Sequence, residues 1–495
     1  MLRHDGTIAR NRSLDPKVMS ANTEEQEGLD YMRAAQSSTD AQLGDATGRN
    51  INCNRALFTD LYELTMAQAY QAEHMDQLAV FELAFREMPR NRNYIVAAGF
   101  QDVLDFLTGF HFSGEDLGFL SKSGDFSEAF LNWLERLRFT GNVFAVPEGT
   151  LVFPNEPLLQ VIAPITEGQL IETFVLNQIH FQSVASTKAA RVVAAAQGRT
   201  IVDFGSRRSH GVDAALKVAR ATYLAGGDGT SNVLAGKIYG IPTFGTMAHS
   251  YIQAHDEEST SFDSFARLYP DTTLLVDTYD TLAGVRKVIE LSQKLGGHFQ
   301  VRAVRLDSGD LGSLAVDTRR MLDEAGLQRV KIFASSGLDE YKIQDLMSSG
   351  APIDAFGVGT KLAVIADAPD LDMAYKLVEY GGKGRLKLSA KKLLYPGRKQ
   401  VFRQIENGQM VRDVIGRFDE PLAGEPLLKP LMVRGQPVTR IELTESRRRL
   451  QSEIKRLPDH LHGLQSAPAP YPVHFSEQLK SDLNAIRREL GFGDT

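Results

Sequence analysis

The chain has 495 residues, of which 43% are hydrophobic and 24% charged, enough for one large domain plus a second. Its formal net charge of −7 excludes a general nucleic-acid-binding protein, although a local basic pocket remains compatible with it. Cys53 is the only cysteine, which excludes an intrachain disulfide or a cysteine-rich metal site and fits a reducing cytoplasm. With no apolar run near the roughly 18–20 residues of a membrane span and no signal-peptide pattern, we expect a soluble cytoplasmic protein.

The first part of the chain combines a polar start with alternating helices and strands. Residues 1–50 are polar and weakly periodic, so we expect a flexible N-terminal extension. From about Arg55 onward, apolar residues recur at helical or strand spacing. The predicted helices are Asp60–Glu73, Ala98–Leu107, Phe126–Leu137 and Glu167–Ala196, the last with room for one break. The predicted strands are Val80–Phe85, Asn142–Phe153 and Leu158–Ile162.

From about residue 200, short apolar runs alternate with helical patterns such as Leu282–Leu295, Leu314–Ala325 and Leu338–Ser348. This alternation predicts right-handed βαβ units and a parallel sheet. The apolar runs are Thr200–Gly205, Ile241–Gly245, Thr273–Thr278, Val301–Leu306, Val330–Ser335, Ala355–Gly359 and Ala374–Glu379. So many parallel strands favour an α/β fold with an irregular (β/α) barrel over residues 186–379. An open doubly wound sheet is the structural alternative.

After about residue 380 the alternation stops. Residues 385–399 are strongly basic, and a proline-punctuated tail follows. Within that tail, Thr444–Leu457 has the pattern of a charged helix, whose alternating signs predict a solvated face. Residues 51–185 and 380–495 are each short for a domain, so we expect these N- and C-terminal segments to join into a second α/β domain, with the barrel inserted between them.

Six of the apolar runs end in polar or glycine residues. Parallel strands of a barrel bring their C-terminal ends to one mouth, so this pattern predicts a ligand site there. The simpler alternative is a set of βα turns with helix caps, since Ser and Asp are common caps. The ends in question are Phe204–Arg208, Thr246–Ser250, Asp277–Thr278, Arg305–Asp310, Ser335–Gly337 and Gly357–Thr360.

Two of the chemistries at these ends are phosphate binding and metal binding. Ser336–Gly337 and Gly359–Thr360 are small-residue loops before helical patterns, where backbone N–H groups favour a phosphate. Asp277, Asp307 and Asp310 form an acidic rim suited to Mg²⁺ and ribose hydroxyls.

Positive and aromatic side chains complete the set. Arg207, Arg208 and Arg305 supply charge for a second anionic group. Phe204 offers an aromatic face for a flat ring. A phosphate, a sugar, a metal ion and a flat anionic ring together indicate phosphoribosyl transfer to a heterocycle.

Two histidines are candidates for a covalent phosphate acceptor, because imidazole is a good nucleophile near neutral pH. His249 follows G-T-M-A at one of the strand ends, and His210 lies in R-R-S-H-G. Spacing alone does not choose between them, and a capping or core role is the simpler interpretation of His249. Gly226–Lys237 has the composition of a Walker A loop but not its spacing, which excludes a P-loop.

The motifs of the chain, taken together, resemble those of nicotinate phosphoribosyltransferases. The resemblance runs in order from about residue 57 to 405 and does not include residues 1–50. The matching motifs are F-T-D-L-Y-E-L-T-M, D-F-G-S-R-R, G-T-S-N-V-L-A-G, G-T-M-A-H-S, V-D-T-Y-D, V-R-L-D-S-G-D-L, S-S-G-L-D-E, G-V-G-T, Y-K-L-V-E-Y and P-G-R-K-Q-V-F-R.

The resemblance implies a type II phosphoribosyltransferase barrel and an α/β domain built from both ends of the chain. It also implies a reaction, in which nicotinate and 5-phosphoribosyl 1-diphosphate give nicotinate mononucleotide and pyrophosphate in NAD salvage. Hydrolysis of ATP would be coupled to this reaction, and Mg²⁺ would be the cofactor. The family works as a homodimer with shared sites, which implies that Tyr62 reaches the site from a second subunit.

The resemblance also assigns expected roles to single residues. It implies that His249, rather than His210, is the histidine that is phosphorylated. We expect Asp277 and Asp307 to be catalytic, and Asp277 and Asp310 to bind the metal ion. Contacts to nicotinate or to the phosphoribosyl group are expected at Tyr62, Phe204, Arg207, Ser231, Thr246, Arg305, Ser308, Gly309, Ser336, Gly337, Gly359 and Thr360.

One departure and two alternatives bear on this reading. Some relatives have a glycine-rich stretch where this chain has Arg90–Asn93, which puts the phosphate contacts of this loop in doubt. Nicotinamide phosphoribosyltransferase shares the fold, but it has an aspartate for the amide nitrogen where this chain has Ser231, so nicotinate is favoured. A regulatory barrel that binds nucleotides without turnover is the other alternative, against which the set of Asp277, Arg305, Asp307 and His249 argues.

Overall fold

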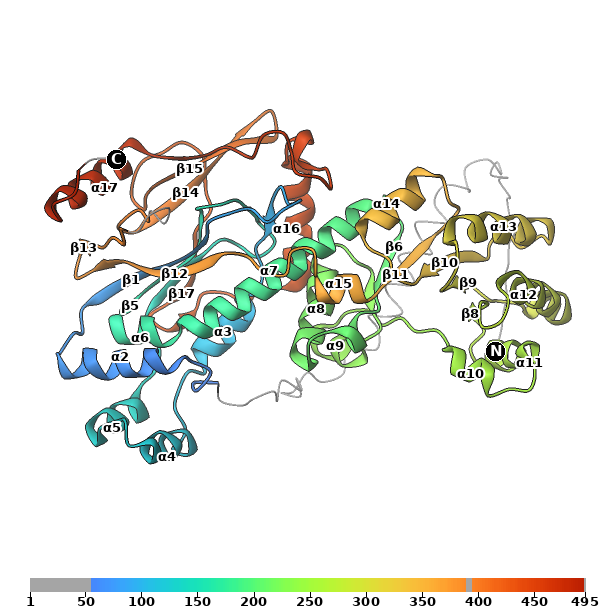
Figure 1. The fold of residues 1–495 in the computed structure, drawn as a ribbon, viewed down its shortest axis with the longest axis horizontal. Coiled ribbons are helices and arrows are strands. Elements are labelled where there is room, and N and C mark those ends of the chain that lie inside the picture. The colour runs from blue at the N-terminus through green and yellow to red at the C-terminus, as the bar shows by residue number, and fades with distance from the viewer. Residues whose placement is uncertain (1–54, 389–393, 494–495) are drawn as a thin grey trace, which may run out of the picture. The chain divides into compact units, whose positions relative to one another are not determined.

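The computed structural model describes residues 55–388 and 394–493, which belong to one compact unit (Figure 1). The predicted flexible extension, residues 1–50, lies outside the described residues, and the predicted domain boundaries stay a prediction. Among the helices of the described ranges, none combines the length and apolar character needed to cross a bilayer.

The first sheet has seven strands in the order β13-β12-β1-β5-β3-β17-β18, and it draws them from both ends of the chain. The central strand β1 pairs antiparallel with β12 on one side and with β5 on the other. N-terminal and C-terminal segments therefore share one hydrogen-bonded layer (Figure 1). The strands are β1 (Leu78–Phe85), β3 (Asn142–Ala145), β5 (Pro157–Pro164), β12 (Met373–Tyr380), β13 (Lys383–Gly384), β17 (Lys429–Val433) and β18 (Gln436–Pro437).

The run Ala374–Glu379 was expected to be a strand of the parallel sheet, and that assignment is wrong. It forms β12 and pairs antiparallel with β1 over Ala79 to Phe85. A short apolar run shows that a strand will be buried, but it does not show which sheet buries it.

Six helices lie between residues 55 and 195. The predicted break in the last long helix is confirmed, because α6 ends at Leu170 and α7 begins at Glu172. Helix α4 was not predicted, although Ser113 and Asp116 form a capping box at its start and Gly124 ends it at φ +77°. The helices are α2 (Leu61–Ala72), α3 (Phe100–Thr108), α4 (Gly114–Ser123), α5 (Glu128–Arg136), α6 (Ile165–Leu170) and α7 (Glu172–Ala195).

The second sheet has six parallel strands in the order β7-β6-β11-β10-β9-β8, which confirms the prediction of a parallel α/β region. Its strands are β6 (Thr200–Asp203), β7 (Gly229–Thr230), β8 (Thr273–Leu275), β9 (Ala303–Leu306), β10 (Lys331–Ser335) and β11 (Ala355–Val358). The helices of this part are α8 (Val212–Leu224), α9 (Val233–Tyr239), α10 (His249–Gln253), α11 (Glu258–Leu268), α12 (Thr281–Leu295), α13 (Leu311–Glu324), α14 (Glu340–Ser348) and α15 (Thr360–Val364).

The expected barrel is not closed within the described residues, since the sheet ends at β7 on one side and at β8 on the other. The run Ile241–Gly245, expected as a strand, makes a single parallel bridge from Thr243 to Thr230. Pro242 cannot donate a ladder hydrogen bond, and most of the run is exposed, so it does not continue the sheet. The short strand β7 beside it was not predicted.

The C-terminal part adds a hairpin and two helices. Helix α16 was predicted, but the solvated face expected for it is wrong on one side: Ser446, Leu450 and Glu453 are buried, and Glu453 accepts a hydrogen bond of 2.6 Å from Arg403. The remaining elements are β2 (Ile95–Val96) with β4 (Leu151–Val152), the four-stranded sheet of β16 (Glu425–Pro426), β14 (Lys399–Glu406), β15 (Gln409–Arg417) and β19 (Val473–Phe475), and helices α16 (Leu443–Arg456) and α17 (Glu477–Glu489).

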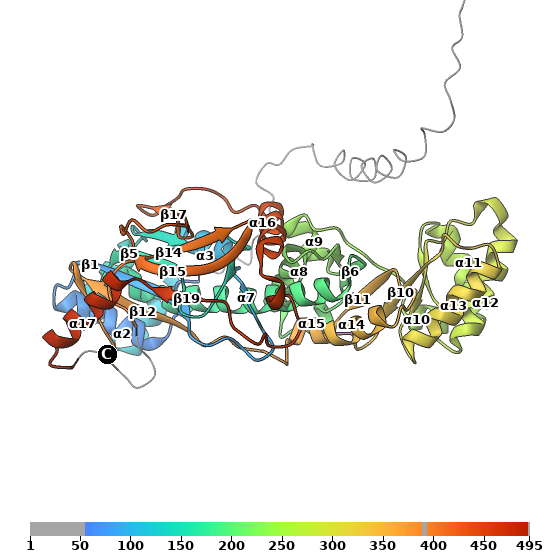
Figure 2. The same cartoon turned by 90° about the horizontal axis from the view of Figure 1, so that it is seen from above.

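Helix α7 connects the two main sheets. It runs from the region of the seven-stranded sheet to the parallel sheet, as both views show (Figures 1 and 2). Sixteen of its 24 residues are buried, among them Lys188 and Arg191. The helix therefore carries buried charge toward the second sheet, and its polar side chains need partners there.

Near its start, α7 is joined to α2 through the buried carboxyl of Glu63. The backbone N–H of Thr173 donates to Glu63 Oε1 over 3.1 Å and the Thr173 hydroxyl over 2.8 Å, and Thr59 also donates to this carboxyl. The pKa of Glu63 is raised to about 8, chiefly by burial and also by the nearby carboxylates of Glu172 and Asp60, against the hydrogen bonds from Thr173 that lower it. Between pH 4.5 and about pH 8, the carboxyl of Glu63 is therefore protonated in the folded protein and ionised in the unfolded chain.

The raised pKa predicts a pH-dependent cost of Glu63. Between the unfolded pKa of 4.5 and the folded pKa of about 8, the folded state binds more protons, so stability falls as pH rises across that window. The cost at pH 9 is on the order of a few kcal/mol. Glu63→Gln should therefore raise Tm at pH 9 relative to the parent, with a smaller gain at pH 5, as measured by thermal unfolding.

A matched control is Glu73→Gln, which removes a carboxylate from the exposed end of the same helix. Its Tm difference from the parent should change little between pH 5 and 9. An equal Tm difference for Glu63→Gln at both pH values would contradict the raised pKa.

Candidate active site

The polar strand ends meet at one edge of the parallel sheet. Strands β8, β9, β10, β11 and β6 are successive neighbours and run in the same direction, so their C-terminal ends lie side by side. Asp277 follows β8, Arg305 lies in β9 with Asp307 just beyond it, and Ser335 ends β10. Side chains far apart in the sequence are thus brought together as expected.

Arg305 lies at the centre of this cluster. Its Nη1 donates to Thr246 Oγ1 over 2.5 Å, and its Nη2 is 3.6 Å from Asp307 Oδ2. The side chain is 12% exposed, and its buried Nε has no hydrogen-bond partner within the described residues. Burial lowers the pKa of Arg305, although Asp307 and Asp277 raise it. A buried guanidinium with a free donor is suited to binding an anionic ligand.

An aromatic ring lies beside this guanidinium. The ring of Phe204, which follows β6, has its centroid 6.0 Å from the Arg305 guanidinium and stacks on Phe333 at 5.6 Å between centroids. Gly357 in β11 makes room for it, because a Cβ there would lie 2.6 Å from the Phe204 ring. The positive charge of Arg207, in the exposed turn after Phe204, lowers the pKa of Arg305 and so acts on the same site.

Asp277 organises the turn after β9. Its Oδ2 accepts hydrogen bonds from the Asp307 N–H over 3.0 Å and from the Ser308 hydroxyl over 2.5 Å. Its Oδ1 is buried without a hydrogen-bond partner in the part of the chain that the structure describes. Asp307 in turn accepts from the Ser335 hydroxyl over 2.6 Å. One oxygen of Asp277 therefore fixes the turn, while the other is available to a ligand.

The expected metal ligands are not gathered into a cluster. Asp310 is exposed and caps α13, accepting from the N–H groups of Gly312 and Ser313 over 3.2 and 3.4 Å. Within residues 55–388 and 394–493, no three His, Cys, Asp or Glu side chains are placed to hold a metal ion. The unpartnered Oδ1 of Asp277 still fits Mg²⁺, which commonly takes one or two carboxylates and completes its shell with substrate phosphates and water.

His249 is brought to the same cluster, as its position after a strand end suggested. It begins α10, its Nδ1 lies 3.1 Å from the Thr278 hydroxyl, and its Nε2 is 3.6 Å from Asp307 Oδ2. The side chain is 41% exposed, so a second molecule can reach it. His210 is exposed and makes no hydrogen bond or ion pair among the described residues.

The two predicted phosphate loops are exposed at the same edge. Ser336 has φ +93° and Gly337 φ +58°, just before α14, which Asp339 caps. A left-handed conformation is strained for serine and persists only where the surroundings hold it. Gly359 leads directly into α15, whose first residue is the exposed Thr360. Both loops present backbone N–H groups at a helix start, where phosphates bind favourably.

Ser231 and Tyr62 do not contact the Arg305 cluster within one chain. Ser231 is exposed after β7, and its N–H donates to the carbonyl of Asp203 over 2.8 Å. Tyr62 lies in α2 and is 46% exposed. Burial, followed by the charges of Glu172, Glu63 and Asp60, raises the pKa of the Tyr62 hydroxyl above its usual range. Helix α2 contacts α6, α7 and the segment before α5, and no contact with β9 is described.

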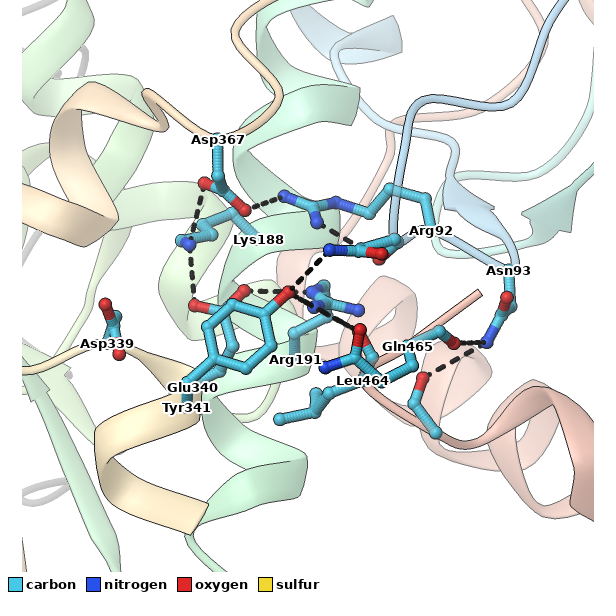
Figure 3. Close-up of polar contacts among 12 residues, drawn as sticks. Arg92, Asn93, Lys188, Arg191, Asp339, Glu340, Tyr341, Asp367, Leu464 and Gln465 are labelled. Atoms are coloured by element: carbon cyan, nitrogen blue, oxygen red, sulfur yellow. Dashed lines mark hydrogen bonds and ion pairs between the residues drawn. The ribbon is translucent and has the colours of Figure 1, made fainter. Parts of the chain in front are cut away.

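Sequence analysis missed two sets of supporting residues. Asp203 holds the turn after β6, accepting from the Gly205 N–H and the Thr230 hydroxyl over 2.7 Å each. Lys188 and Arg191 lie buried in α7 (Figure 3). The available signal was a pair of basic residues inside an otherwise apolar helical stretch, since buried cations need anionic partners.

The comparisons with known proteins bear on the reaction at this site. Two family models match: the nicotinate phosphoribosyltransferase N-terminal domain over residues 57–180 and the nicotinate phosphoribosyltransferase family over residues 200–387. A Mycobacterium tuberculosis protein named nicotinate phosphoribosyltransferase pncB2 is 58% identical over 87% of this chain and 94% of its own length. A Bacillus subtilis nicotinate phosphoribosyltransferase is 41% identical over 76% of this chain and 78% of its own.

A solved structure supports the same conclusion. The crystal structure of human nicotinic acid phosphoribosyltransferase superimposes with a TM-score of 0.78 at 30% identity, covering 86% of this chain and 99% of that one. The names of these relatives favour nicotinate over nicotinamide, the alternative that the sequence left open. These matches show that the chain belongs to the nicotinate phosphoribosyltransferase family.

Proposed function

We propose that the chain joins nicotinate to 5-phosphoribosyl 1-diphosphate, with ATP hydrolysis coupled to the reaction in the manner of a ligase. The ring nitrogen of nicotinate bonds to C1 of the ribose, the bond from C1 to the diphosphate oxygen breaks, and nicotinate mononucleotide and pyrophosphate leave. The observation that carries this proposal is the buried guanidinium of Arg305, which keeps a free donor beside the aromatic face of Phe204.

The nicotinate carboxylate is assigned to Arg305. The hydroxyl of Thr246, already bonded to Nη1, holds the guanidinium in place. Phe204 supplies the face against which the pyridine ring stacks. Nicotinamide carries no charge to match a buried guanidinium, and Ser231, where an aspartate would repel a carboxylate, is neutral. The substrate is therefore the acid rather than the amide.

The phosphoribosyl group is assigned to the turn after β9 and the two loops beyond it. The backbone at Ser308 and Gly309, the loop Ser336–Gly337 and the loop Gly359–Thr360 offer N–H groups to phosphates. Arg207 adds positive charge from the exposed turn after β6. Asp307 lies between Arg305 and His249 and is placed to orient the ribose.

Mg²⁺, when bound, would neutralise charge on the diphosphate and so stabilise it as a leaving group. The unpartnered Oδ1 of Asp277 is the carboxylate oxygen assigned to it. Asp310 is occupied as a helix cap, and its part in metal binding requires that cap to open or to be shared.

ATP coupling is assigned to His249. Thr278 occupies Nδ1, which leaves Nε2 as the nucleophile. This nitrogen takes the γ-phosphoryl group as the bond to ADP breaks, and water later releases phosphate. The partial exposure of the ring lets ATP approach. A phosphoryl group on Nε2 would lie beside the carboxylate of Asp307, and a bound Mg²⁺ would reduce the repulsion between them.

Two further proposals concern assembly and location. Because Tyr62 is half-exposed and its helix contacts α6 and α7, we assign its nicotinate contact to the site of a second copy in a homodimer. The reducing cytoplasm, with which a single cysteine is compatible, is the proposed compartment for this step of NAD salvage.

Replacing Arg305 tests the nicotinate assignment. Arg305→Ala removes a charge-assisted, largely buried contact, so the stabilisation of the transition state should fall by roughly 2–5 kcal/mol. This loss corresponds to a decrease in kcat/KM for nicotinate of about 30-fold to several thousand-fold. Arg305→Lys should rescue only in part, because the planar fork is lost. Steady-state kinetics with nicotinate as the varied substrate measures both. Near-normal nicotinate kinetics in Arg305→Ala would remove this residue from the site.

Labelling with γ-labelled ATP tests the histidine assignment. His249→Ala should lose ATP hydrolysis, ATP stimulation and the acid-labile, base-stable label, while a slow ATP-independent transfer survives. His210→Ala is the matched control and should keep the label and both activities, because His210 is exposed and has no described hydrogen bond or ion pair with Arg305, Asp307 or Asp277. Label that persists in His249→Ala and disappears in His210→Ala would make His210 the phosphate acceptor.

A further inference from the structure

Each phosphate loop leads into a carboxylate, and a single lysine binds both carboxylates. The loop Ser336–Gly337 precedes α14, whose first residue is Glu340, and Asp367 follows α15, which begins at Thr360. The Nζ of Lys188 in α7 lies 2.6 Å from Glu340 Oε2 and 2.8 Å from Asp367 Oδ1 (Figure 3). The two loops come from different βα units, so this lysine is a direct link between them.

Two arginines bind the remaining oxygens of these carboxylates. Arg191, one turn beyond Lys188 in α7, donates from Nε to Glu340 Oε1 over 3.0 Å. Arg92, in the loop before β2, donates to Asp367 Oδ2 over 2.8 Å. Both oxygens of each carboxylate therefore have a cationic partner (Figure 3). Within the Arg90–Asn93 loop, the side chain of Arg92 is thus engaged in a contact inside the protein.

Four of these five side chains, named here together the α7 network, are buried, whereas that of Asp367 is one-third exposed. The side chains of Lys188, Arg191 and Glu340 are 3%, 5% and 0% exposed. Burial raises the pKa of Asp367, but hydrogen bonds and charges from Lys188 and Arg92 lower it overall to about 2. Three cationic side chains pair with two carboxylates, so the α7 network has one more basic than acidic side chain.

Stability alone is a weak reason for such a network. Desolvation of buried ions offsets much of their attraction, and apolar side chains of similar volume often stabilise a fold as well. The directional contacts do something that apolar packing does not, because they set the position of two separate loops relative to one helix. Ser336, in its strained left-handed conformation, lies only four residues before Glu340.

We propose that Lys188, Glu340 and Asp367, with Arg191 and Arg92, are positioning residues that set the spacing of the two phosphate loops and so the affinity for 5-phosphoribosyl 1-diphosphate. None of the five is assigned a contact with substrate. The inference rests on the proposed phosphate-binding function of Ser336, Gly337, Gly359 and Thr360. Small displacements of groups that position a substrate are known to reduce binding and rate strongly.

The main test compares Lys188→Met with Lys399→Met. Lys399 is a matched control, since its Nζ pairs with Glu82 at 3.0 Å, both side chains are 2% exposed, and strands β14 and β1 lie outside the parallel sheet. In Lys188→Met, KM for 5-phosphoribosyl 1-diphosphate should rise by about tenfold or more, while kcat and KM for nicotinate change by less than about threefold. Lys399→Met should lower Tm to a similar extent and leave all three constants near those of the parent.

Milder variants keep the test open if Lys188→Met does not fold. Asp367→Asn removes the charge that pairs with Lys188 and Arg92 beyond the loop Gly359–Thr360. Because this side chain is one-third exposed, the fold should tolerate the change. Glu340→Gln removes the charge that pairs with Lys188 and Arg191 beyond the loop Ser336–Gly337. Each should raise KM for 5-phosphoribosyl 1-diphosphate, and Asp367→Asn combined with Lys188→Met should cost less than the sum of the two, because they break the same contact.

Thr360→Ala separates this inference from the proposed function. If Thr360→Ala raises KM for 5-phosphoribosyl 1-diphosphate while Lys188→Met and Asp367→Asn lower only Tm, the loops bind phosphate and the network is merely structural, which overturns the inference alone. If Thr360→Ala also leaves that KM unchanged, the assignment of the loop fails and the inference fails with it.

Discussion

The constraint on which the rest of this structure depends is the burial of helix α7 together with its two basic side chains. Lys188 and Arg191 are removed from water over nearly all of their surface, so each needs an acidic or carbonyl partner. Those partners are Glu340 at the start of α14, Asp367 beyond the end of α15, and the carbonyl of Leu464 near the C-terminus. One helix thereby ties the parallel sheet to the segments at both ends of the chain.

Much of the candidate site could be predicted from the sequence, because the C-terminal ends of parallel strands lie at one edge of a sheet. The run that ends in Arg305 and Asp307 is apolar and then abruptly charged, and such a strand can expose its charges only at its C-terminal end. Asp310, three residues further on, was predicted as a metal ligand by the same rule, and the structure shows it as the cap of α13. An aspartate before a helix is equally a cap, and only the three-dimensional contacts distinguish a cap from a metal ligand.

What escaped prediction depends on partners distant in sequence. Lys188 is 152 positions from Glu340 and 179 from Asp367, and nothing local to α7 points to either. The strand β12 has the same apolar pattern as its predecessors but pairs with β1, nearly 300 positions earlier. The prediction of a strand at Ile241–Gly245 was wrong for a local reason, because Pro242 has no N–H to donate to a neighbouring strand. Propensity and periodicity are properties of a single segment. The strand with which that segment pairs, and the partner of each of its ions, depend on residues elsewhere in the chain.

The contacts of Asn93 have a consequence for how the chain is made. Its side-chain amide donates to the carbonyls of Leu461, Gly463 and Gln465, and its Oδ1 accepts from the N–H of Ala467. A loop formed early in translation is thus closed by residues that emerge from the ribosome more than 360 positions later. At about 5–20 residues per second, that interval lasts roughly 20–70 seconds. Asn93 therefore lacks these four hydrogen-bond partners until well after the six strands of the parallel sheet have been synthesised.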